Sequence, residues 1–317
     1  MILVVSYPGD EHTVNVIQRL EGNGREVVLL DLSDFPAHKG LVLSWPIDNS
    51  PAYLINDSNG IIDLKKTHVG WWRRVRPFSI DQAIASPSMR AFAESETSQA
   101  ISGMLDALQC TWVNPRGSDA AAQHKPFQWA TARKVGLQLP RTLVTTKPDA
   151  ARKFITEVGV GKTIFKAFLA SLDAWRETRL VEREDFERLD LVRYAPVIFQ
   201  EYVEGVDLRI TVIGDKVFAA EIDAQNTSYP VDMRMVVGEA RVRPTQLPPK
   251  LLAALLELQS QLGLRYGAID MRRTPSGEYI FLEVNPAGQW LFVEQRTGMP
   301  ISQTVADFLT DLDDLPL

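Results

Sequence analysis

Three oxygen-bearing side chains, Asp270, Glu283 and Asn285, stand on two apolar segments in the C-terminal part of the chain. Segments 266–272 and 279–284 are rich in β-forming residues, and a turn with Pro and Gly joins them, which predicts a hairpin. Because side chains alternate between the faces of a strand, Glu283 and Asn285 are expected on one face, where Asp270 can join them. Such a trio suits an open Mg²⁺ site that completes its coordination with water and phosphate oxygens. The alternative interpretation is that these are ordinary polar residues at a strand end.

Basic residues earlier in the chain would complete such a site, since a bound nucleotide needs cations near its phosphates. Lys125 begins a predicted helix, and Lys166 lies within an apolar predicted strand, where a lysine is costly to bury unless it meets an anion. Asp207 and Arg209 are expected on one face of a strand, and Arg234 follows them. Taken singly, each is more typical of a solvated surface charge. Their joint order along the chain is what indicates a nucleotide site.

The stretch Trp71-Trp72-Arg73-Arg74 combines two aromatic residues with two cations. Arginine binds carboxylates and phosphates in a planar, bidentate way, so Arg73 and Arg74 are candidates for holding an acidic substrate. The alternative is that the arginines pair with acidic residues at a domain edge while the tryptophans fill a core. The sequence leaves both interpretations open.

Composition narrows the class of protein. At 317 residues the chain is long enough for two or three domains, and its net charge of −6 argues against nucleic acid as the main partner. No apolar run approaches the length of a membrane span, and the N-terminal residues lack the basic start of a signal peptide. A single cysteine, Cys110, excludes an internal disulfide and fits a reducing, cytoplasmic location. Its apolar surroundings predict a buried, inert thiol.

The order of predicted elements indicates an α/β (α+β) fold in three parts, residues 1–115, 116–195 and 196–317. In the first part, apolar strands at 2–7 and 27–30 flank a helix at 13–20, which is typical of a parallel sheet covered by helices. Segment 159–163 looks like a phosphate-binding loop but runs from helix to strand, the wrong order for that motif. Further helices are predicted at 88–108, 118–124, 125–135, 148–158, 248–262 and 301–309, and strands at 52–55, 61–64, 111–114, 143–145, 163–168, 197–203, 207–213 and 217–222.

Several of these motifs, in this order, resemble the ATP-grasp carboxylate–amine ligases, and the resemblance covers essentially the full chain. The matching motifs are Lys125, Lys166, Gln200-Glu201-Tyr202-Val203, Asp207-Leu208-Arg209, Asp232-Met233-Arg234 and Asp270 with Glu283-Val284-Asn285-Pro286. Within that superfamily the chain is similar to the microviridin-type peptide ligases, also called graspetide synthetases. The motifs that carry this second similarity are Trp71-Trp72-Arg73-Arg74, Trp112-Val113-Asn114-Pro115, Tyr266-Gly267-Ala268-Ile269-Asp270 and Pro300-Ile301-Ser302-Gln303.

The resemblance implies roles for individual residues. Lys125 and Lys166 would contact ATP phosphates, Gln200 and Asp207 would also bind the nucleotide, and Glu201, Tyr202 and Val203 would form the hinge that holds adenine. Arg209 and Arg234 would stabilise the transferred phosphoryl group, Asp270, Glu283 and Asn285 would bind Mg²⁺, and Arg73 and Arg74 would border the substrate. The chain departs from the family pattern at 167–178, which contains no glycine, and at Ala167, where proline is common. No residue is evident as the general base.

The expected activity is that of an ATP- and Mg²⁺-dependent ligase acting on a ribosomally made precursor peptide. It would activate Asp or Glu side chains as acyl phosphates and close ω-ester links to Ser or Thr, or ω-amide links to Lys. A groove for a leader helix and a homodimer are further expectations. One alternative is a ligase that adds a free amino acid such as glutamate to a carboxylate. Another is an ATP-binding regulatory protein without turnover.

Overall fold

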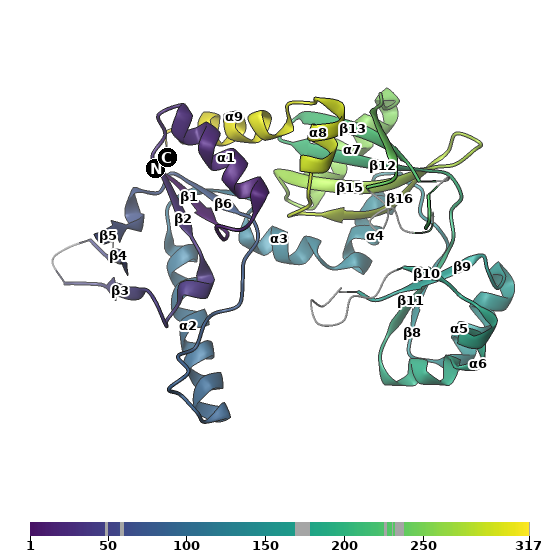
Figure 1. The fold of residues 1–317 in the computed structure, drawn as a ribbon, viewed down its shortest axis with the longest axis horizontal. Helices are drawn as coiled ribbons and strands as arrows, with labels where there is room; N and C mark the ends of the chain where they lie inside the picture. Colours follow the sequence, from purple (N-terminus) through teal and green to yellow (C-terminus); the bar gives the residue numbers. More distant parts are fainter. Residues whose placement is uncertain are drawn as a thin grey trace. The chain divides into compact units, whose positions relative to one another are not determined.

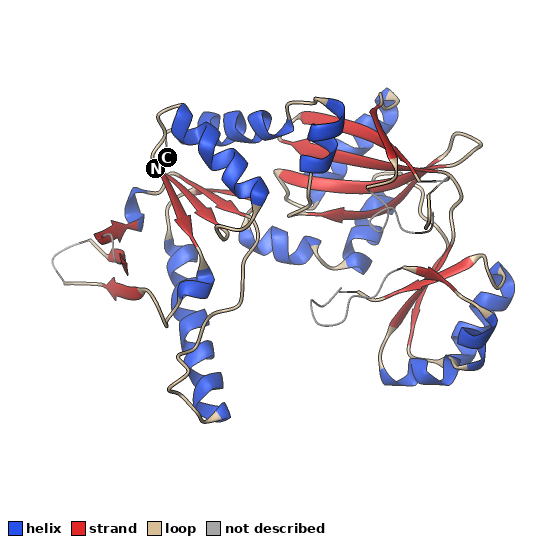
Figure 2. Cartoon of the chain, in the orientation of Figure 1, coloured by secondary structure: helices blue, strands red, loops and turns tan. Residues whose placement is uncertain are grey.

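The structure is a computed structural model, and it describes residues 1–47, 50–57, 60–168, 178–224, 227–229, 231 and 238–316. The chain divides into two compact units (Figure 1). Unit 1 comprises Met1–Gly117 and Pro300–Leu317, and unit 2 comprises Ser118–Met299. Helices and strands occur together in both units (Figure 2), which confirms the predicted α/β class. No helix in the described residues is both long and apolar enough to cross a membrane.

Unit 1 is built on the predicted parallel sheet, with strand order β2-β1-β6-β7. Its strands are short apolar runs, and all of β1 is buried, as expected for a sheet covered on both faces. An antiparallel sheet, β3-β4-β5, lies beside it in the same unit. The hairpin between β4 and β5 was predicted, whereas β3 and β6 were not. The strands are β1 Ile2–Val5, β2 Val27–Leu30, β3 Gly40–Ser44, β4 Ala52–Asp57, β5 Gly60–Asp63, β6 Val69–Trp72 and β7 Thr111–Val113.

Three long helices belong to unit 1 among the described residues: α1 Glu11–Gly22, α2 Pro87–Ala107 and α9 Ile301–Asp313. Asp10 caps the start of α1, since its carboxylate accepts a hydrogen bond from the Thr13 N–H at 3.2 Å. Helix α9 packs against α1, so the last helix of the chain lies with the first strand and helix (Figure 1). Cys110 is half-buried, not fully buried as expected. Partial burial raises the pKa of its thiol to about 11, and the inertness of the thiol stays a prediction.

Unit 2 contains two antiparallel sheets (Figure 1). The first has strand order β10-β9-β11-β8 and packs its apolar face against α5. Its elements are β8 Thr142–Thr145, α5 Pro148–Val158, β9 Thr163–Lys166, β10 Arg179–Leu180, α6 Arg183–Glu187 and β11 Val197–Glu201. The Gly159 that follows α5 has a φ of +115°, which suits a glycine at a helix end.

The second sheet of unit 2 has strand order β14-β13-β12-β15-β16, and its core face packs against α4 and α7. The hairpins β12–β13 and β15–β16 confirm two of the sequence predictions, whereas β14 and α8 were not predicted. The elements are α4 Lys125–Lys134, β12 Val206–Ile213, β13 Lys216–Asp223, β14 Arg241–Pro244, α7 Pro249–Gln261, β15 Tyr266–Arg273, β16 Tyr279–Asn285 and α8 Leu291–Thr297; α3, Arg116–Ala122, begins at the boundary of the units.

A polar side chain without a hydrogen-bond partner among the described residues lies where α7 packs on this sheet. Gln259 of α7 is 3% exposed, and its Oε1 and Nε2 have no hydrogen-bond partner among the described residues. We expect Gln259→Leu to stabilise the protein by about 1 kcal/mol, because it removes two buried polar atoms and keeps the volume. Thermal unfolding should show a midpoint about 2 °C higher. Gln261→Leu, at an exposed position of the same helix, is the control, and a destabilised Gln259→Leu variant would contradict the assignment.

Candidate nucleotide and metal site

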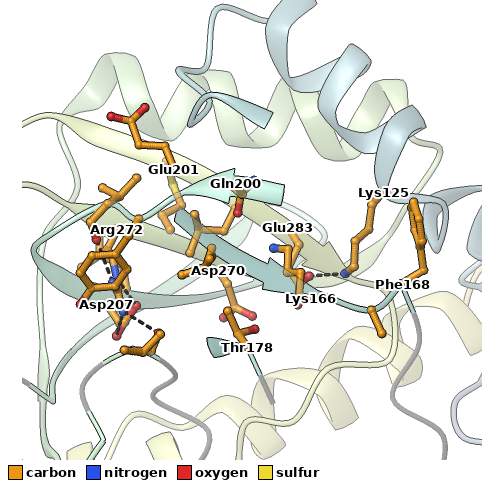
Figure 3. Close-up of a pocket in the computed structure, with 18 residues that line it drawn as sticks. Lys125, Lys166, Phe168, Thr178, Gln200, Glu201, Asp207, Asp270, Arg272 and Glu283 are labelled. Carbon is orange, nitrogen blue, oxygen red and sulfur yellow. Dashed lines mark hydrogen bonds and ion pairs between the residues drawn. The ribbon is translucent and has the colours of Figure 1, made fainter. Parts of the chain in front are cut away.

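A pocket in unit 2 brings together most of the residues predicted from the sequence (Figure 3). They come from both sheets of the unit and from the start of α4. Apolar side chains, among them Ile164, Met271 and Leu282, supply surface of the kind on which a base can stack. The predicted residues that line the pocket are Lys125, Lys166, Gln200, Glu201, Tyr202, Val203, Asp207, Asp270 and Glu283.

Two carboxylates of the pocket face each other across a strand pair, and each is held by a cation. Asp270 of β15 lies opposite Glu283 of β16 in the sheet register, as the hairpin predicted. The Nη1 of Arg209 donates to Asp270 at 2.8 Å, and the Nζ of Lys125 forms an ion pair with Glu283. Both carboxylates are largely buried, with side chains 16% and 21% exposed. Pairing therefore offsets the desolvation of two close negative charges.

Lys125 is placed by the first turns of α4, which hydrogen bonds fasten to β16. The Gln128 side chain accepts from the Val284 N–H at 3.0 Å and donates to the Val284 carbonyl at 2.8 Å. The Trp129 indole N–H donates to the Leu282 carbonyl at 3.1 Å. These contacts lie within four residues of Lys125 along the helix, so they fix its distance from Glu283.

Arg209 is a buried cation behind the pocket. Its Nη2 and Nε donate to the Gln289 carbonyl at 2.8 and 3.3 Å. Burial acts to lower the pKa of Arg209, but the Asp270 carboxylate outweighs it and raises the pKa above its ordinary value. Space for the guanidinium depends on Gly288, where a Cβ would lie 2.9 Å from the Arg209 Nη2 and 2.3 Å from the Ala268 Cβ. Arg209 is thus a permanent charge held against Asp270.

The predicted hinge leaves β11 at the edge of the pocket. The Glu201 N–H donates to the Arg141 carbonyl and the Tyr202 N–H to the Lys162 carbonyl, each at 2.8 Å. The Glu201 carboxylate points away from Lys125 and Glu283 (Figure 3). These two hydrogen bonds fix the hinge backbone on both sides. A fixed backbone is what a segment needs if its main-chain groups are to bind a base.

Arg272 lines the pocket and was not predicted as a site residue. It is 5% exposed and binds both oxygens of Asp207, with Nε–Oδ1 at 2.8 Å and Nη2–Oδ2 at 3.0 Å. A sequence signal existed, because Asp-x-Arg occurs at 207–209 and again at 270–272. In the antiparallel register of β12 and β15, each Asp of one motif lies opposite the Arg of the other. The repeat therefore encodes two cross-strand ion pairs.

Besides Arg209, which lies behind the pocket, four predicted residues are not in its lining. Asn285 lies opposite Ala268 on β16, is exposed, and accepts a hydrogen bond from the Ala287 N–H at 3.0 Å. Arg234 lies outside the described residues. In unit 1, the buried Arg73 has its Nε 3.5 Å from the Asp10 carboxylate, and Arg74 is half-buried. The substrate role of the two arginines stays a prediction.

Asp270, Glu283 and Asn285 are the candidate ligands for the Mg²⁺ that the sequence suggested. Among the described residues, no group of three or more His, Cys, Asp and Glu side chains could hold a metal ion. Asp270 and Glu283 face each other directly, and Asn285 stands two residues further along the same strand. Two carboxylates and one amide fit Mg²⁺, which keeps waters and phosphate oxygens in its coordination shell.

Two models of known protein families match this chain. Residues 122–309 match the model of the RimK-like ATP-grasp domain, and residues 1–119 match the MvdD pre-ATP grasp domain. The first match covers more than half of the chain. The chain belongs to the RimK-like ATP-grasp family. The predicted ATP-grasp fold is thereby confirmed, while the three-part boundaries at residues 115 and 195 stay a prediction.

This ATP-grasp protein is similar over nearly its full length to a solved macrocyclase and a solved ATP-grasp ligase. The macrocyclase MdnC from Microcystis aeruginosa MRC, bound with the precursor peptide MdnA, is 30% identical with a TM-score of 0.87, covering 98% of this chain and 99% of MdnC. The ATP-grasp ligase PsnB, complexed with a phosphomimetic variant of its minimal precursor, Mg and ADP, is 26% identical with a TM-score of 0.81, covering 99% and 98%.

Curated relatives match a shorter part of the chain. A probable alpha-L-glutamate ligase 2 from Shewanella amazonensis is 26% identical over 180 residues, which is 55% of this chain. The match spans 58% of the length of that ligase. The chain thus matches this glutamate ligase over little more than half of its length, and MdnC and PsnB over nearly all of it.

Proposed function

We propose that this protein is an ATP-dependent peptide ligase that cross-links a ribosomally made precursor peptide. It joins Asp or Glu side chains to Ser or Thr as ω-esters, or to Lys as ω-amides. The observation that carries the proposal is the near-complete mutual coverage with the macrocyclase MdnC, which extends through the N-terminal pre-ATP grasp domain. The glutamate ligase is matched over 58% of its length.

The pocket supports ATP and Mg²⁺ as the cosubstrate and the metal. Lys125 and Lys166 would contact the phosphates, Tyr202 and Val203 the adenine edge, and Ile164 and Met271 the faces of the base. Asp270, Glu283 and Asn285 would hold Mg²⁺, whose charge offsets the negative charge of the phosphate oxygens when it is bound. PsnB, complexed with Mg and ADP, supports this placement by similarity.

The chemistry follows from the poor reactivity of a carboxylate toward nucleophiles. A side-chain carboxylate oxygen of the peptide attacks the γ-phosphorus of ATP, ADP leaves, and an acyl phosphate results. A hydroxyl or amine of the same peptide then attacks the acyl carbon, loses its proton, and expels phosphate. Arg209 and Arg234 stabilise the charge on the transferring group, and Arg73 and Arg74 border the acidic substrate. Water must be excluded, because hydrolysis of the acyl phosphate competes.

Mass spectrometry of a precursor peptide encoded beside this chain tests the proposal. Incubation with the protein, ATP and Mg²⁺ should remove about 18 Da per cross-link, because each closure is a net dehydration. Reactions without ATP or without Mg²⁺ are the controls. An unchanged peptide mass alongside intact ATP binding would count against the proposal.

Addition of a free amino acid is the second candidate function. The match of residues 122–309 to the RimK-like domain and the similarity to a probable alpha-L-glutamate ligase favour it. The nucleotide residues serve both reactions equally, so they do not discriminate. The same mass spectra do, because ligation of glutamate adds the mass of one glutamyl residue where cross-linking removes water.

A further inference from the structure

The hinge segment is tied to the C-terminal sheet by one side chain. Arg272 of β15 donates from Nη1 to the Val203 carbonyl at 2.8 Å, while its Nε and Nη2 bind Asp207 of β12. Its guanidinium also lies over the Tyr202 ring, 5.1 Å from the ring centroid. A single buried arginine thus contacts the side chain of one hinge residue and the backbone of the next.

After the hinge, the backbone passes close to the end of β15. Gly205, between the hinge and β12, has a φ of +142°, and a Cβ there would lie 2.1 Å from the Arg273 carbonyl. The backbone therefore crosses directly over the end of β15. Asp207 follows two residues later and receives the fork of Arg272. The hinge, the crossing and the ion pair form one continuous attachment between β11 and β15.

The chemistry of this attachment suits arginine and excludes lysine. The planar guanidinium directs separate N–H groups at a carboxylate and at a carbonyl, and its flat face stacks on an aromatic ring. An ammonium group carries its three donors on one nitrogen and has no flat face, so it cannot bind both carboxylate oxygens in parallel, reach the carbonyl from a separate nitrogen and stack on the ring. Burial favours the paired state further, because the Arg272 charge can leave Asp207 only by becoming an unpaired buried ion.

We propose that Arg272 is a positioning residue that sets the place of the Tyr202–Val203 hinge and so determines both nucleotide affinity and the preference for adenine over guanine. This inference rests on the proposed function for the hinge as the adenine-binding segment. Adenine and guanine differ at the edge that a hinge backbone reads, so a displaced hinge loses discrimination as well as affinity. Arg272 contacts the hinge and Asp207, and it acts on the base through the backbone of Val203.

Arg272→Lys is the test variant, and Arg273→Lys is the matched control. Arg273 is the next residue of β15 and also pairs with a buried carboxylate, with Nη1 at 2.5 Å from Glu221. Its side chain is not part of the pocket lining. Isothermal titration calorimetry with ADP and with GDP, in the presence of Mg²⁺, gives the dissociation constants of the wild type and both variants.

We expect Arg272→Lys to raise the dissociation constant of ADP at least about tenfold. The dissociation constant of GDP should rise by a several-fold smaller factor, so the GDP constant divided by the ADP constant falls. Arg273→Lys should keep both constants. Unchanged ADP affinity in a folded Arg272→Lys variant would overturn the proposal. So would an equal loss for ADP and GDP, because that result indicates a purely structural role.

A second variant covers the case in which Arg272→Lys does not fold. Asp207→Asn keeps the shape of the carboxylate and removes its charge, which loosens the fork from its anchor. The ratio of ADP to GDP affinity should fall in this variant too, whereas a direct contact of Asp207 with the sugar would weaken both nucleotides equally. The titrations contain no peptide, so they decide on Arg272 whether or not the protein cross-links a precursor.

Discussion

Glu283→Gln is expected to lower ATP-dependent turnover about a thousandfold while the protein stays folded. The amide can still accept a hydrogen bond from Lys125, so the contact between α4 and β16 survives. The charge does not survive, and a neutral ligand opposite Asp270 binds a divalent cation far more weakly. The effect should therefore fall on the metal-dependent step, leaving the apolar surfaces that hold the base unchanged.

The measurement is the rate of ADP release in the presence of peptide, ATP and Mg²⁺, together with near-ultraviolet circular dichroism as a check of the fold. Glu278→Gln is the control, since Glu278 is an exposed residue next to the same strand and hydrogen-bonds to Ser276. It should retain wild-type turnover. Wild-type turnover in a folded Glu283→Gln variant would remove Glu283 from the metal site.

Lys125→Met is expected to change the binding of metal and of nucleotide in opposite directions. In the structure Lys125 neutralises Glu283, so Mg²⁺ must displace a cation before it can bind this carboxylate. Without the lysine, Mg²⁺ alone should bind about tenfold more tightly, because Glu283 is left without a counter-charge. Nucleotide affinity without metal should fall about tenfold, because a cation for the phosphates is lost.

Calorimetric titration with Mg²⁺ alone, and with ADP in the presence of a chelator, separates the two effects. Lys134→Met, at the exposed end of the same helix, should alter neither constant. If Mg²⁺ affinity in Lys125→Met equals that of the wild type, the ion pair does not compete with metal. The expected pattern means that nucleotide and metal assist each other, since phosphate draws Lys125 away from the carboxylate that the metal needs.

The parts of the site that were predicted depend on local rules. Alternation along two strands and a turn between them were enough to expect Asp270 on one face with Glu283 and Asn285. The register in the structure places Asp270 opposite Glu283. Lys166 drew attention because a lysine is costly to bury in an apolar strand, and Lys125 because of its place in the order of motifs along the chain. Each of these inferences uses residues that are close in sequence, so the pattern carried the information.

The parts that were not predicted depend on pairing over long distances or on weak local signals. Arg272 and Asp207 meet only because β12 and β15 pair in one particular register. Arg73 can pair with Asp10 only because β6 lies beside β1. The composition of the Trp71–Arg74 stretch does not predict that strand neighbour. Helix α8 is short and has no side-chain hydrogen bond at its N-cap, so its start had no signature.

The attachment of α9 bears on how the chain can be divided. The chain leaves unit 1 at Gly117 and re-enters it at Pro300, so the whole of unit 2 is an insertion within unit 1. The Met1 amino group lies 3.4 Å from Asp313. A fragment that begins with unit 2 and ends at residue 309, where the RimK-like match ends, would contain most of the amphipathic helix α9 but not its partner α1. A nucleotide-binding fragment should instead end before Pro300. The neighbouring ends of unit 1 suit a short linker and circular permutation.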